Sequence, residues 1–156
     1  MTKRIAVFPG SFSPFTKGHE SVVLRALPLF DQIIVSIGIN SSKKEYFSIE
    51  DRIKWINQIF QDNEKVRVMQ YKGLTIDHCK KHGANYILRG LRNPQDFNYE
   101  MGIAQTNYSL SPDIETVFII TEPIYAHISS TLVRDIIING GKVDQFLPDA
   151  ISIDNK

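Results

Sequence analysis

The chain has few of the residues that build disulfides, metal clusters or membrane spans. It contains one cysteine, Cys79, in 156 residues, so it forms no internal disulfide and offers no cysteine cluster to a metal. No apolar run approaches the roughly 20 residues that a membrane-spanning helix needs. The formal net charge is +1, from 18 Lys and Arg against 17 Asp and Glu. General nucleic-acid binders usually carry a larger basic excess.

The start of the chain does not resemble a secretory signal. The apolar run Ile5–Phe8 is too short for one and is broken at once by Pro9-Gly10. Hydrophobic residues make up 42% of the chain and charged residues 22%, as in ordinary globular proteins. We therefore expect a cytoplasmic protein whose residues 1–156 form one domain, and which binds neither nucleic acid nor a membrane.

Short β-branched runs alternate with segments of helical periodicity. This alternation is typical of a parallel sheet with right-handed crossovers. The predicted fold class is therefore α/β, a Rossmann-like, doubly wound five-stranded parallel sheet with helices on both faces. The predicted strands are Ile5–Phe8, Ile33–Ile37, Val66–Gln70, Tyr86–Leu88 and Thr116–Ile120.

Local signals indicate where several helices begin and end. Ser48 is a predicted N-cap and Pro94 a predicted first-turn proline. Asn139-Gly140-Gly141 is typical of a helix C-terminus. The tail Asp149–Lys156 is weakly patterned, and we expect it to fray.

The loop after the first predicted strand is a candidate ligand loop. The strand ends in Pro9-Gly10, and regular structure resumes at Thr16-Lys17-Gly18-His19. Ligands of open α/β sheets bind at the carboxyl ends of strands, and a helix N-terminus favours anions. The loop therefore suits a phosphate group, with His19 as a hydrogen-bond donor. In the alternative interpretation, His19 is only a polar residue of the first helical turn.

A second candidate phosphate site follows the last predicted strand, in the segment His127 to Arg134. Three consecutive hydroxyls, Ser129, Ser130 and Thr131, stand at the start of a predicted helix. Any one of them could serve only as a helix cap. Three hydroxyls supply more donors than a cap requires, which favours a phosphate-binding site.

Two arginines follow the fourth predicted strand. Arg89 and Arg92 stand on either side of Gly90-Leu91 and would form a cationic fork suited to phosphates. In the alternative interpretation they form salt bridges between domains or subunits. Asp96, Tyr99 and Glu100 could be their partners, or could contact a ribose.

Two other polar groups give weaker signals. The pair Lys43-Lys44 follows the second strand, although lysine pairs in loops are usually solvated. His78 and His82 are spaced as zinc ligands, but no second ligand pair accompanies them, so we expect them on a helix surface. We expect Cys79, between them, to be a small buried residue of that helix.

These polar sites all follow strands and should converge on one edge of the sheet. The sequence lacks the Gly-x-Gly-x-x-Gly fingerprint, the P-loop and the Gly-x-Ser-x-Gly nucleophile elbow. Donors and cations without an evident nucleophile favour a reaction between two ligands. If one ligand is a phosphate monoester, it needs no general base, and the protein contributes positioning and charge stabilisation.

Several of these motifs resemble those of one family. Thr16–His19 and Ile128–Arg134 resemble the TxGH and ISSTxxR motifs of the nucleotidyltransferase superfamily. Arg89–Arg92 followed by Asp96–Glu100 narrows the resemblance to the phosphopantetheine adenylyltransferases, and the similarity extends over nearly the whole chain. The resemblance implies reversible adenylyl transfer from ATP to 4′-phosphopantetheine, giving dephospho-coenzyme A and pyrophosphate. This is the penultimate step of coenzyme A biosynthesis. It also implies in-line attack without a covalent enzyme intermediate, Mg²⁺ accompanying the triphosphate, and a homo-hexamer.

The resemblance also implies roles for particular residues. His19 would stabilise the transition state, and Ser11 would contact both ligands. Lys43 and Arg89 would hold the phosphate end of the acceptor, and Thr75 would line its pantetheine arm. No protein side chain is expected to bind the metal directly. The ATP site would be lined by Ser11, Phe12, His19, Gly90, Leu91, Arg92, Glu100, Tyr125, Ala126, His127, Ile128, Ser129, Ser130 and Thr131.

The chain departs from the family pattern at two places. Family members commonly carry aspartate where this chain has Ser13, and the tail Asp149–Lys156 looks less helical than the family's final helix. Two alternative functions remain open from the sequence. One is another nucleotidyltransferase, of the glycerol-3-phosphate cytidylyltransferase or nicotinamide-mononucleotide adenylyltransferase type. The other is an inactive nucleotide-binding regulatory module.

Overall fold

The five strands form one parallel sheet, in the order β3-β2-β1-β4-β5. The computed structural model describes residues 2–153. Each predicted strand is confirmed, with small extensions at the ends. The strands are β1 (Ile5–Gly10), β2 (Gln32–Gly38), β3 (Val66–Tyr71), β4 (Tyr86–Leu91) and β5 (Glu115–Ile120).

Helices connect these strands. They are α1 (Lys17–Ala26), α2 (Ile49–Ile59), α3 (Thr75–Lys81), α4 (Pro94–Leu110) and α5 (Ser130–Ile138). Short 3-10 turns lie at Leu27–Leu29, Pro123–Tyr125 and Asp144–Phe146. No helix within residues 2–153 is both long enough and apolar enough to cross a membrane.

Both faces of the sheet are covered, as the predicted doubly wound fold requires. On one face, Ala6 and Phe8 of β1 pack with Val23 of α1 and Ile56 of α2. On the other face, apolar side chains of the strands pack against Ile76 and Cys79 of α3. The expected burial of Cys79 is therefore confirmed.

The predicted helix signals are confirmed. The Ser48 hydroxyl accepts a hydrogen bond from the Asp51 N–H at 3.1 Å and caps α2. Pro94 is the first residue of α4. Helix α5 ends at Ile138, and Gly140 follows with φ +76°, in the left-handed region that glycine tolerates best.

Two expectations from the sequence were wrong. His78 was expected on the surface, but it is only 6% exposed and its Nε2 lies 2.9 Å from the Ser36 hydroxyl. Within the tail, Ile151 is buried in a third apolar cluster with Val133 of α5 and Leu147, so this part does not fray. The remainder of the expected fraying, at residues 154–156, lies outside the described residues.

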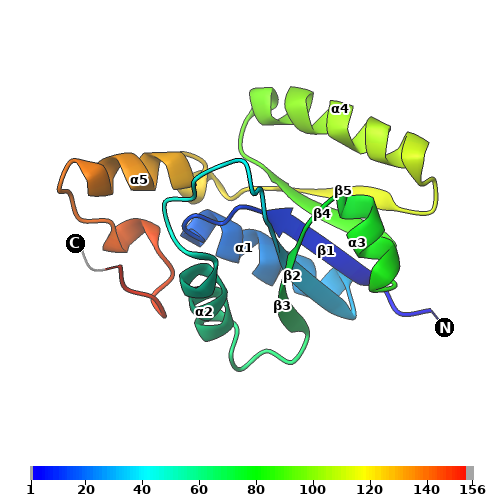
Figure 1. Cartoon of the computed structure of the whole chain (residues 1–156), viewed down its shortest axis with the longest axis horizontal. Coiled ribbons are helices and arrows are strands. Elements are labelled where there is room, and N and C mark those ends of the chain that lie inside the picture. The colour runs from blue at the N-terminus through cyan, green and yellow to red at the C-terminus, as the bar shows by residue number, and fades with distance from the viewer. Residues whose placement is uncertain (1, 154–156) are drawn as a thin grey trace.

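The strand order reverses at β1, and this reversal positions the site. From β1 the chain builds outward through β2 and β3, then returns to form β4 on the other side of β1. The arrow of β1 points to the end of the molecule where α5 lies (Figure 1). Crevices for ligands form outside the carboxyl ends of the strands at such a switch point.

Candidate active site

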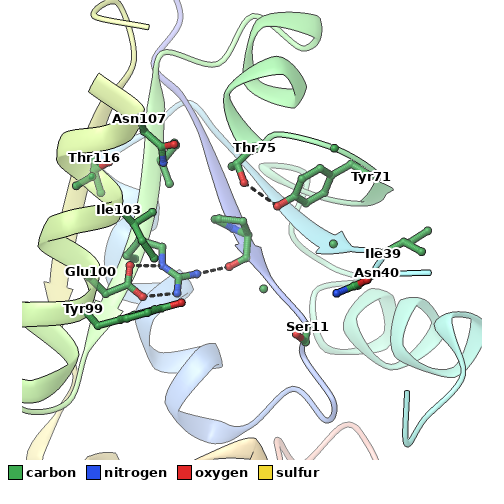
Figure 2. Close-up of a pocket in the computed structure, with 17 residues that line it drawn as sticks. Ser11, Ile39, Asn40, Tyr71, Thr75, Tyr99, Glu100, Ile103, Asn107 and Thr116 are labelled. Atoms are coloured by element: carbon green, nitrogen blue, oxygen red, sulfur yellow. Dashed lines mark hydrogen bonds and ion pairs between the residues drawn. The ribbon is translucent and has the colours of Figure 1, made fainter. Parts of the chain in front are cut away.

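Two cavities open at this end of the sheet and share one wall. The first, the α3 cavity, has a volume of about 360 Å³ and includes Gly38, Tyr71 and Thr75 (Figure 2). The second, the α1 cavity, has a volume of about 480 Å³ and includes His19 and Arg92. The residues that line both are Pro9, Gly10, Ser11, Arg89 and Glu100. Two ligands, one in each cavity, would therefore meet at the end of β1 beside Arg89.

His19 is held as a neutral ring with a defined tautomer. The Thr16 N–H donates a hydrogen bond to Nδ1 of His19 at 3.0 Å, so the proton of the neutral imidazole lies on Nε2. Burial, together with the smaller effects of the charges of Arg89 and Arg92, lowers the pKa of His19 from 6.5 to about 3. His19 is therefore suited to donate a hydrogen bond and not to relay protons. His19 is therefore more than an ordinary polar residue of the first helical turn, because its ring lines the α1 cavity.

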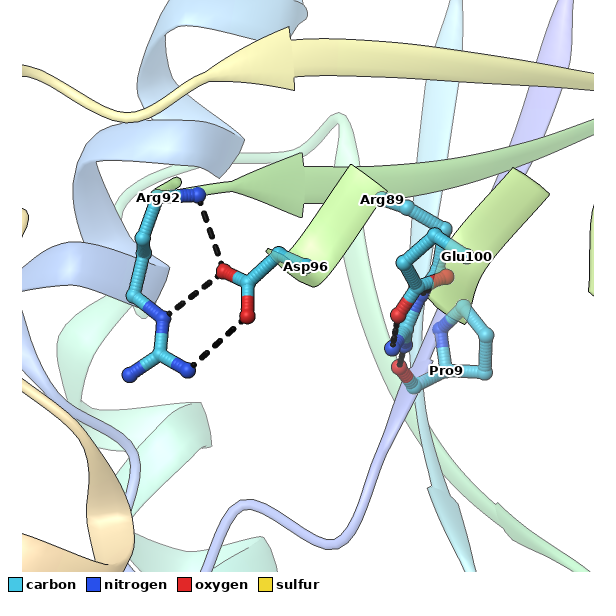
Figure 3. A network of polar contacts seen from close by, with 5 residues as sticks. All are labelled: Pro9, Arg89, Arg92, Asp96 and Glu100. Atoms are coloured by element: carbon cyan, nitrogen blue, oxygen red, sulfur yellow. Dashed lines mark hydrogen bonds and ion pairs between the residues drawn. The ribbon is translucent and has the colours of Figure 1, made fainter. Parts of the chain in front are cut away.

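Arg89 stands on the shared wall and is held from two sides. Its Nε donates to Oε2 of Glu100 at 2.8 Å, and a second guanidinium nitrogen pairs with Oε1 (Figure 3). A third contact, from NH1 to the Pro9 carbonyl at 2.5 Å, ties the side chain to β1. Glu100 is only 7% exposed, so the guanidinium that balances its charge is fixed in place.

Arg92 is paired in the same way. Its Nε donates to Oδ2 of Asp96 at 3.0 Å, and its backbone N–H donates to the same oxygen at 2.9 Å (Figure 3). Partial burial would raise the pKa of Asp96, but the hydrogen bonds from Arg92 outweigh it and the pKa is lowered. Asp96 and Glu100 are thus the partners of these arginines, as the sequence suggested, but the ion pairs lie within one domain and not between domains. Both arginines nevertheless line the α1 cavity, so pairing and ligand contact are compatible.

Three side chains hold the carbonyl groups of the loop after β1. Arg52 of α2 donates to the Ser11 carbonyl at 2.8 Å, and Arg134 of α5 donates to the Ser13 carbonyl at 2.7 Å. The Ser130 hydroxyl donates to the Pro14 carbonyl at 2.8 Å. With its carbonyls engaged by these groups, the loop is held in one conformation beside both cavities.

The hydroxyls at the start of α5 have different partners. Ser129 caps the helix by accepting from the Leu132 N–H at 3.1 Å. Ser130 bonds to the loop after β1, and the Thr131 hydroxyl accepts from Arg134 at 3.2 Å. Capping alone therefore explains only Ser129, and all three residues line the α1 cavity.

Most residues singled out from the sequence come together here. Thr75 lies apart from the α1 cavity, in the α3 cavity. Lys43 lies on the side of His19 and Arg92, and not beside Thr75. The predicted residues that line the α1 cavity are Ser11, Phe12, His19, Lys43, Arg89, Gly90, Arg92, Glu100, Ile128, Ser129, Ser130 and Thr131.

Four predicted residues line neither cavity. Leu91 is the last residue of β4, and its carbonyl accepts a hydrogen bond from the Thr121 N–H at 2.8 Å. Tyr125, Ala126 and His127 lie between β5 and α5. The Tyr125 carbonyl is nevertheless close to the start of α1, 3.8 Å from where a Cβ on Gly18 would be.

The sequence reasoning missed several residues of the site. Tyr71 and Asn40 line the α3 cavity, and both stand at or just after the end of a strand, the same signal that identified the other loops. Asn107 lines this cavity from the last turn of α4, where no local pattern indicates it. Arg52 was also missed, because its contact with the Ser11 carbonyl joins segments that are far apart in sequence.

Comparisons with known proteins agree with this geometry. The family model described as cytidylyltransferase-like matches residues 7–136. A structure of a bifunctional NMN adenylyltransferase/ADP ribose pyrophosphatase from Francisella tularensis is similar, with a TM-score of 0.71 and 20% identity. The match covers 99% of this chain and 46% of that one. Fold and site thus define a nucleotidyltransferase of the cytidylyltransferase-like type.

Closer relatives narrow this class. A phosphopantetheine adenylyltransferase from Flavobacterium psychrophilum is 52% identical over 150 residues, which cover 96% of this chain and 99% of the relative. One from Cytophaga hutchinsonii is 52% identical over 145 residues, covering 93% and 97%. The chain belongs to the phosphopantetheine adenylyltransferase family.

Proposed function

We propose that the protein transfers the adenylyl group of ATP to the phosphate of 4′-phosphopantetheine. The products are dephospho-coenzyme A and pyrophosphate, and the reaction is reversible. The observation that carries this proposal is the pair of cavities that share Ser11 and Arg89, with His19 beside them. A reaction between two bound ligands needs this arrangement, and the relatives at 52% identity bear the corresponding name.

The two cavities suggest where each substrate binds. We assign ATP to the α1 cavity, because it is the larger of the two cavities and is lined by His19, Arg92 and the start of α5. We assign the acceptor to the α3 cavity, with its phosphate at Arg89 and its arm toward Thr75. Lys43 lines the α1 cavity, so we propose that it contacts phosphates at the junction and not the arm.

The reaction we propose is direct in-line transfer. An oxygen of the acceptor phosphate attacks the α-phosphorus of ATP and forms the new P–O bond. The bond from the α-phosphorus to its bridging oxygen breaks, and pyrophosphate leaves with the electron pair. Because the attacking phosphate is already an anion, no general base and no covalent enzyme intermediate are required.

The protein's own contribution is positioning and charge stabilisation. Arg89 is fixed by Glu100 and the Pro9 carbonyl, so it can hold the acceptor phosphate without first becoming ordered. Nε2–H of His19 would donate to the charge that develops on the α-phosphate in the transition state.

We propose that Mg²⁺ enters with the triphosphate and helps to neutralise its charge. Residues 2–153 contain no group of three or more His, Cys, Asp or Glu side chains that could hold a metal ion. Phosphate oxygens and water would therefore supply its ligands, as is usual for Mg²⁺ bound to nucleotides.

We also propose a homo-hexamer that works in the cytoplasm. The number six rests on the family resemblance. Support for association comes from large apolar side chains exposed on α4, which are Phe97, Tyr99, Met101, Ile103, Tyr108 and Leu110. Sedimentation equilibrium tests the assembly, and a monomer at micromolar concentration would overturn it. Fractionation of cells tests the location, and recovery of the protein outside the cytoplasm would overturn that part.

Pyrophosphate release from ATP and Mg²⁺, with and without 4′-phosphopantetheine, tests the function. We expect release only with the acceptor, together with stoichiometric dephospho-coenzyme A. Parallel reactions with CTP and glycerol-3-phosphate, and with ATP and nicotinamide mononucleotide, test the other nucleotidyltransferase activities. Preferred turnover of either pair would overturn the proposal. Binding of ATP without turnover of any acceptor would favour the regulatory module.

A further inference from the structure

The wall of the α3 cavity carries a pair of hydroxyl groups, of which only that of Thr75 belongs to a residue with a role in the proposed function. Tyr71 is the last residue of β3, and Thr75 is the first residue of α3. Their hydroxyl oxygens lie 2.8 Å apart (Figure 2). One hydroxyl donates to the other, so one O–H of the pair remains for a hydrogen bond to a ligand, whichever way the pair is oriented.

The ring of Tyr71 is held by contacts from two elements. The imidazole of His78, on α3, stacks on it with ring centroids 4.5 Å apart and an interplanar angle of 20°. On β2, a Cβ at Gly38 would lie 3.6 Å from the ring atoms of Tyr71, so the ring lies close to the backbone of that glycine. The hydroxyl of Tyr71 is therefore directed to Thr75 by packing of the whole ring.

His78 is itself anchored in the interior. Its Nε2 lies 2.9 Å from the hydroxyl of Ser36, which is fully buried on β2. That hydroxyl also donates to the Ile34 carbonyl at 3.2 Å, which leaves its oxygen to accept the Nε2–H of His78. A continuous set of contacts thus runs from the backbone of β2 through Ser36 and His78 to the cavity wall.

The surroundings keep His78 uncharged near neutral pH. Burial lowers the pKa of His78, and the nearby charges of His82 and Lys81, at the C-terminal end of α3, add to this effect. The other ionisable group against the ring is Tyr71, which stacks on it. A neutral imidazole can keep both the stack and the single hydrogen bond to Ser36.

We propose that Tyr71 is a specificity-determining residue for the arm of the acceptor, and that His78 is the positioning residue that fixes it. This inference rests on the proposed function. The cavity also presents the side-chain amides of Asn40 and Asn107, so its lining suits an arm that carries amide groups. The hydroxyl pair would bind one of the amide groups of the acceptor's arm, away from the acceptor phosphate at Arg89.

Steady-state kinetics of Tyr71→Phe and His78→Ala test this inference. Both variants should raise the KM for 4′-phosphopantetheine about three- to tenfold, the range for one lost hydrogen bond, without changing the KM for ATP. His78→Phe keeps a stacked ring and should restore most of the acceptor affinity. Lys80→Ala, an exposed change on the same helix, is the matched control and should leave both KM values unchanged.

The double variant separates positioning from general damage to the fold. If His78 acts through the Tyr71 hydroxyl, the KM for the acceptor in the Tyr71→Phe/His78→Ala variant should be no higher than in the more impaired of the two single variants. Additive effects, or equal increases in the KM for ATP and for the acceptor, would overturn the positioning role. Tyr71→Phe keeps the ring that stacks on His78, so it remains a test even if His78→Ala does not fold.

Turnover by the wild-type protein distinguishes failure of this inference from failure of the proposed function. Acceptor-dependent pyrophosphate release by the wild type, with an unchanged acceptor KM in Tyr71→Phe, would overturn this inference alone. No release by the wild type would overturn the proposed function, and the inference with it.

Discussion

The Thr16 N–H donates a hydrogen bond to Nδ1 of His19, across 3.0 Å and within the first turn of α1. The His19 N–H in turn donates to the Thr16 hydroxyl at 3.4 Å, which completes a capping box. One local motif therefore caps the helix and fixes the histidine tautomer. As a consequence, Nε2 carries the proton and can donate a hydrogen bond to a ligand in the α1 cavity.

We expect His19→Ala to lower kcat by about 10²- to 10³-fold, as for the loss of one donor to transition-state charge. Binding of ATP should be nearly unchanged, because the lost interaction strengthens only in the transition state. Rapid-quench measurements check the fall in kcat, and calorimetric titration with ATP checks that ATP binding is nearly unchanged. His19→Gln, which can place an N–H near the same position, should recover part of the rate. An Ala variant with normal kcat would contradict the assigned role.

The pH dependence should not contain the titration of His19. Its pKa is lowered to about 3, so the ring stays neutral from pH 5 upward and loses no donor there. An acid limb in kcat/KM for the acceptor should instead appear at about pH 6, from the second ionisation of the substrate phosphate. His19→Gln should keep this limb in place, whereas a shift of the limb in that variant would show that the histidine titrates.

The same shift has a consequence for stability. Between pH 6.5 and about 3, the unfolded chain protonates His19 and the folded protein does not. The free energy of unfolding should therefore fall as pH decreases through this window. Urea titrations at several pH values would measure the slope, and His19→Gln, which cannot take up the proton, should show a smaller one.

Arg89 and Glu100 should prove to be coupled. Arg89→Ala should raise the KM for the acceptor and should also lower the free energy of unfolding by about 1–3 kcal/mol, because Glu100 keeps a buried charge without its partner. Adding Glu100→Gln should recover part of the stability and none of the acceptor affinity. Chemical denaturation and kinetics on the single and double variants separate the two effects. A change confined to the KM for ATP would contradict the placement of Arg89.

The sequence predicted the fold and the edge of the sheet on which the site lies. Period and composition are local properties, and β-branched runs such as Ile33–Ile37 identify strands without knowledge of their neighbours. Strand ends then located Arg89 and Ser130, since parallel strands bring their carboxyl ends to one edge.

Contacts between segments that are distant in sequence could not be predicted from such local patterns. His78 has a polar side chain at a position that its helix turns inward, and the hydroxyl of Ser36, 42 residues away, makes a hydrogen bond with it there. The contact of Arg52 with the Ser11 carbonyl is of the same kind. A sequence shows that such residues can make hydrogen bonds, but it does not show which partners the fold brings to them.

Two buried serines provide the last prediction, because their hydroxyls differ only in their partners. Ser13 is 2% exposed, and its hydroxyl has no hydrogen-bond partner within the described part of the chain. Ser36 is fully buried, and its hydroxyl contacts both the Ile34 carbonyl and His78. Removing an unpartnered buried hydroxyl relieves a desolvation cost, whereas removing a partnered one leaves a second polar group unsatisfied.

We therefore expect Ser13→Ala to keep or raise the free energy of unfolding, and Ser36→Ala to lower it by about 1–3 kcal/mol. The carbonyl of residue 13 remains available to Arg134 in the Ala variant, so the loop after β1 and kcat should be preserved. Denaturation curves of the two variants, measured side by side, make the comparison. Equal destabilisation would mean that the Ser13 hydroxyl has a partner, and a water bridge to the neighbouring loop would then be its most direct source.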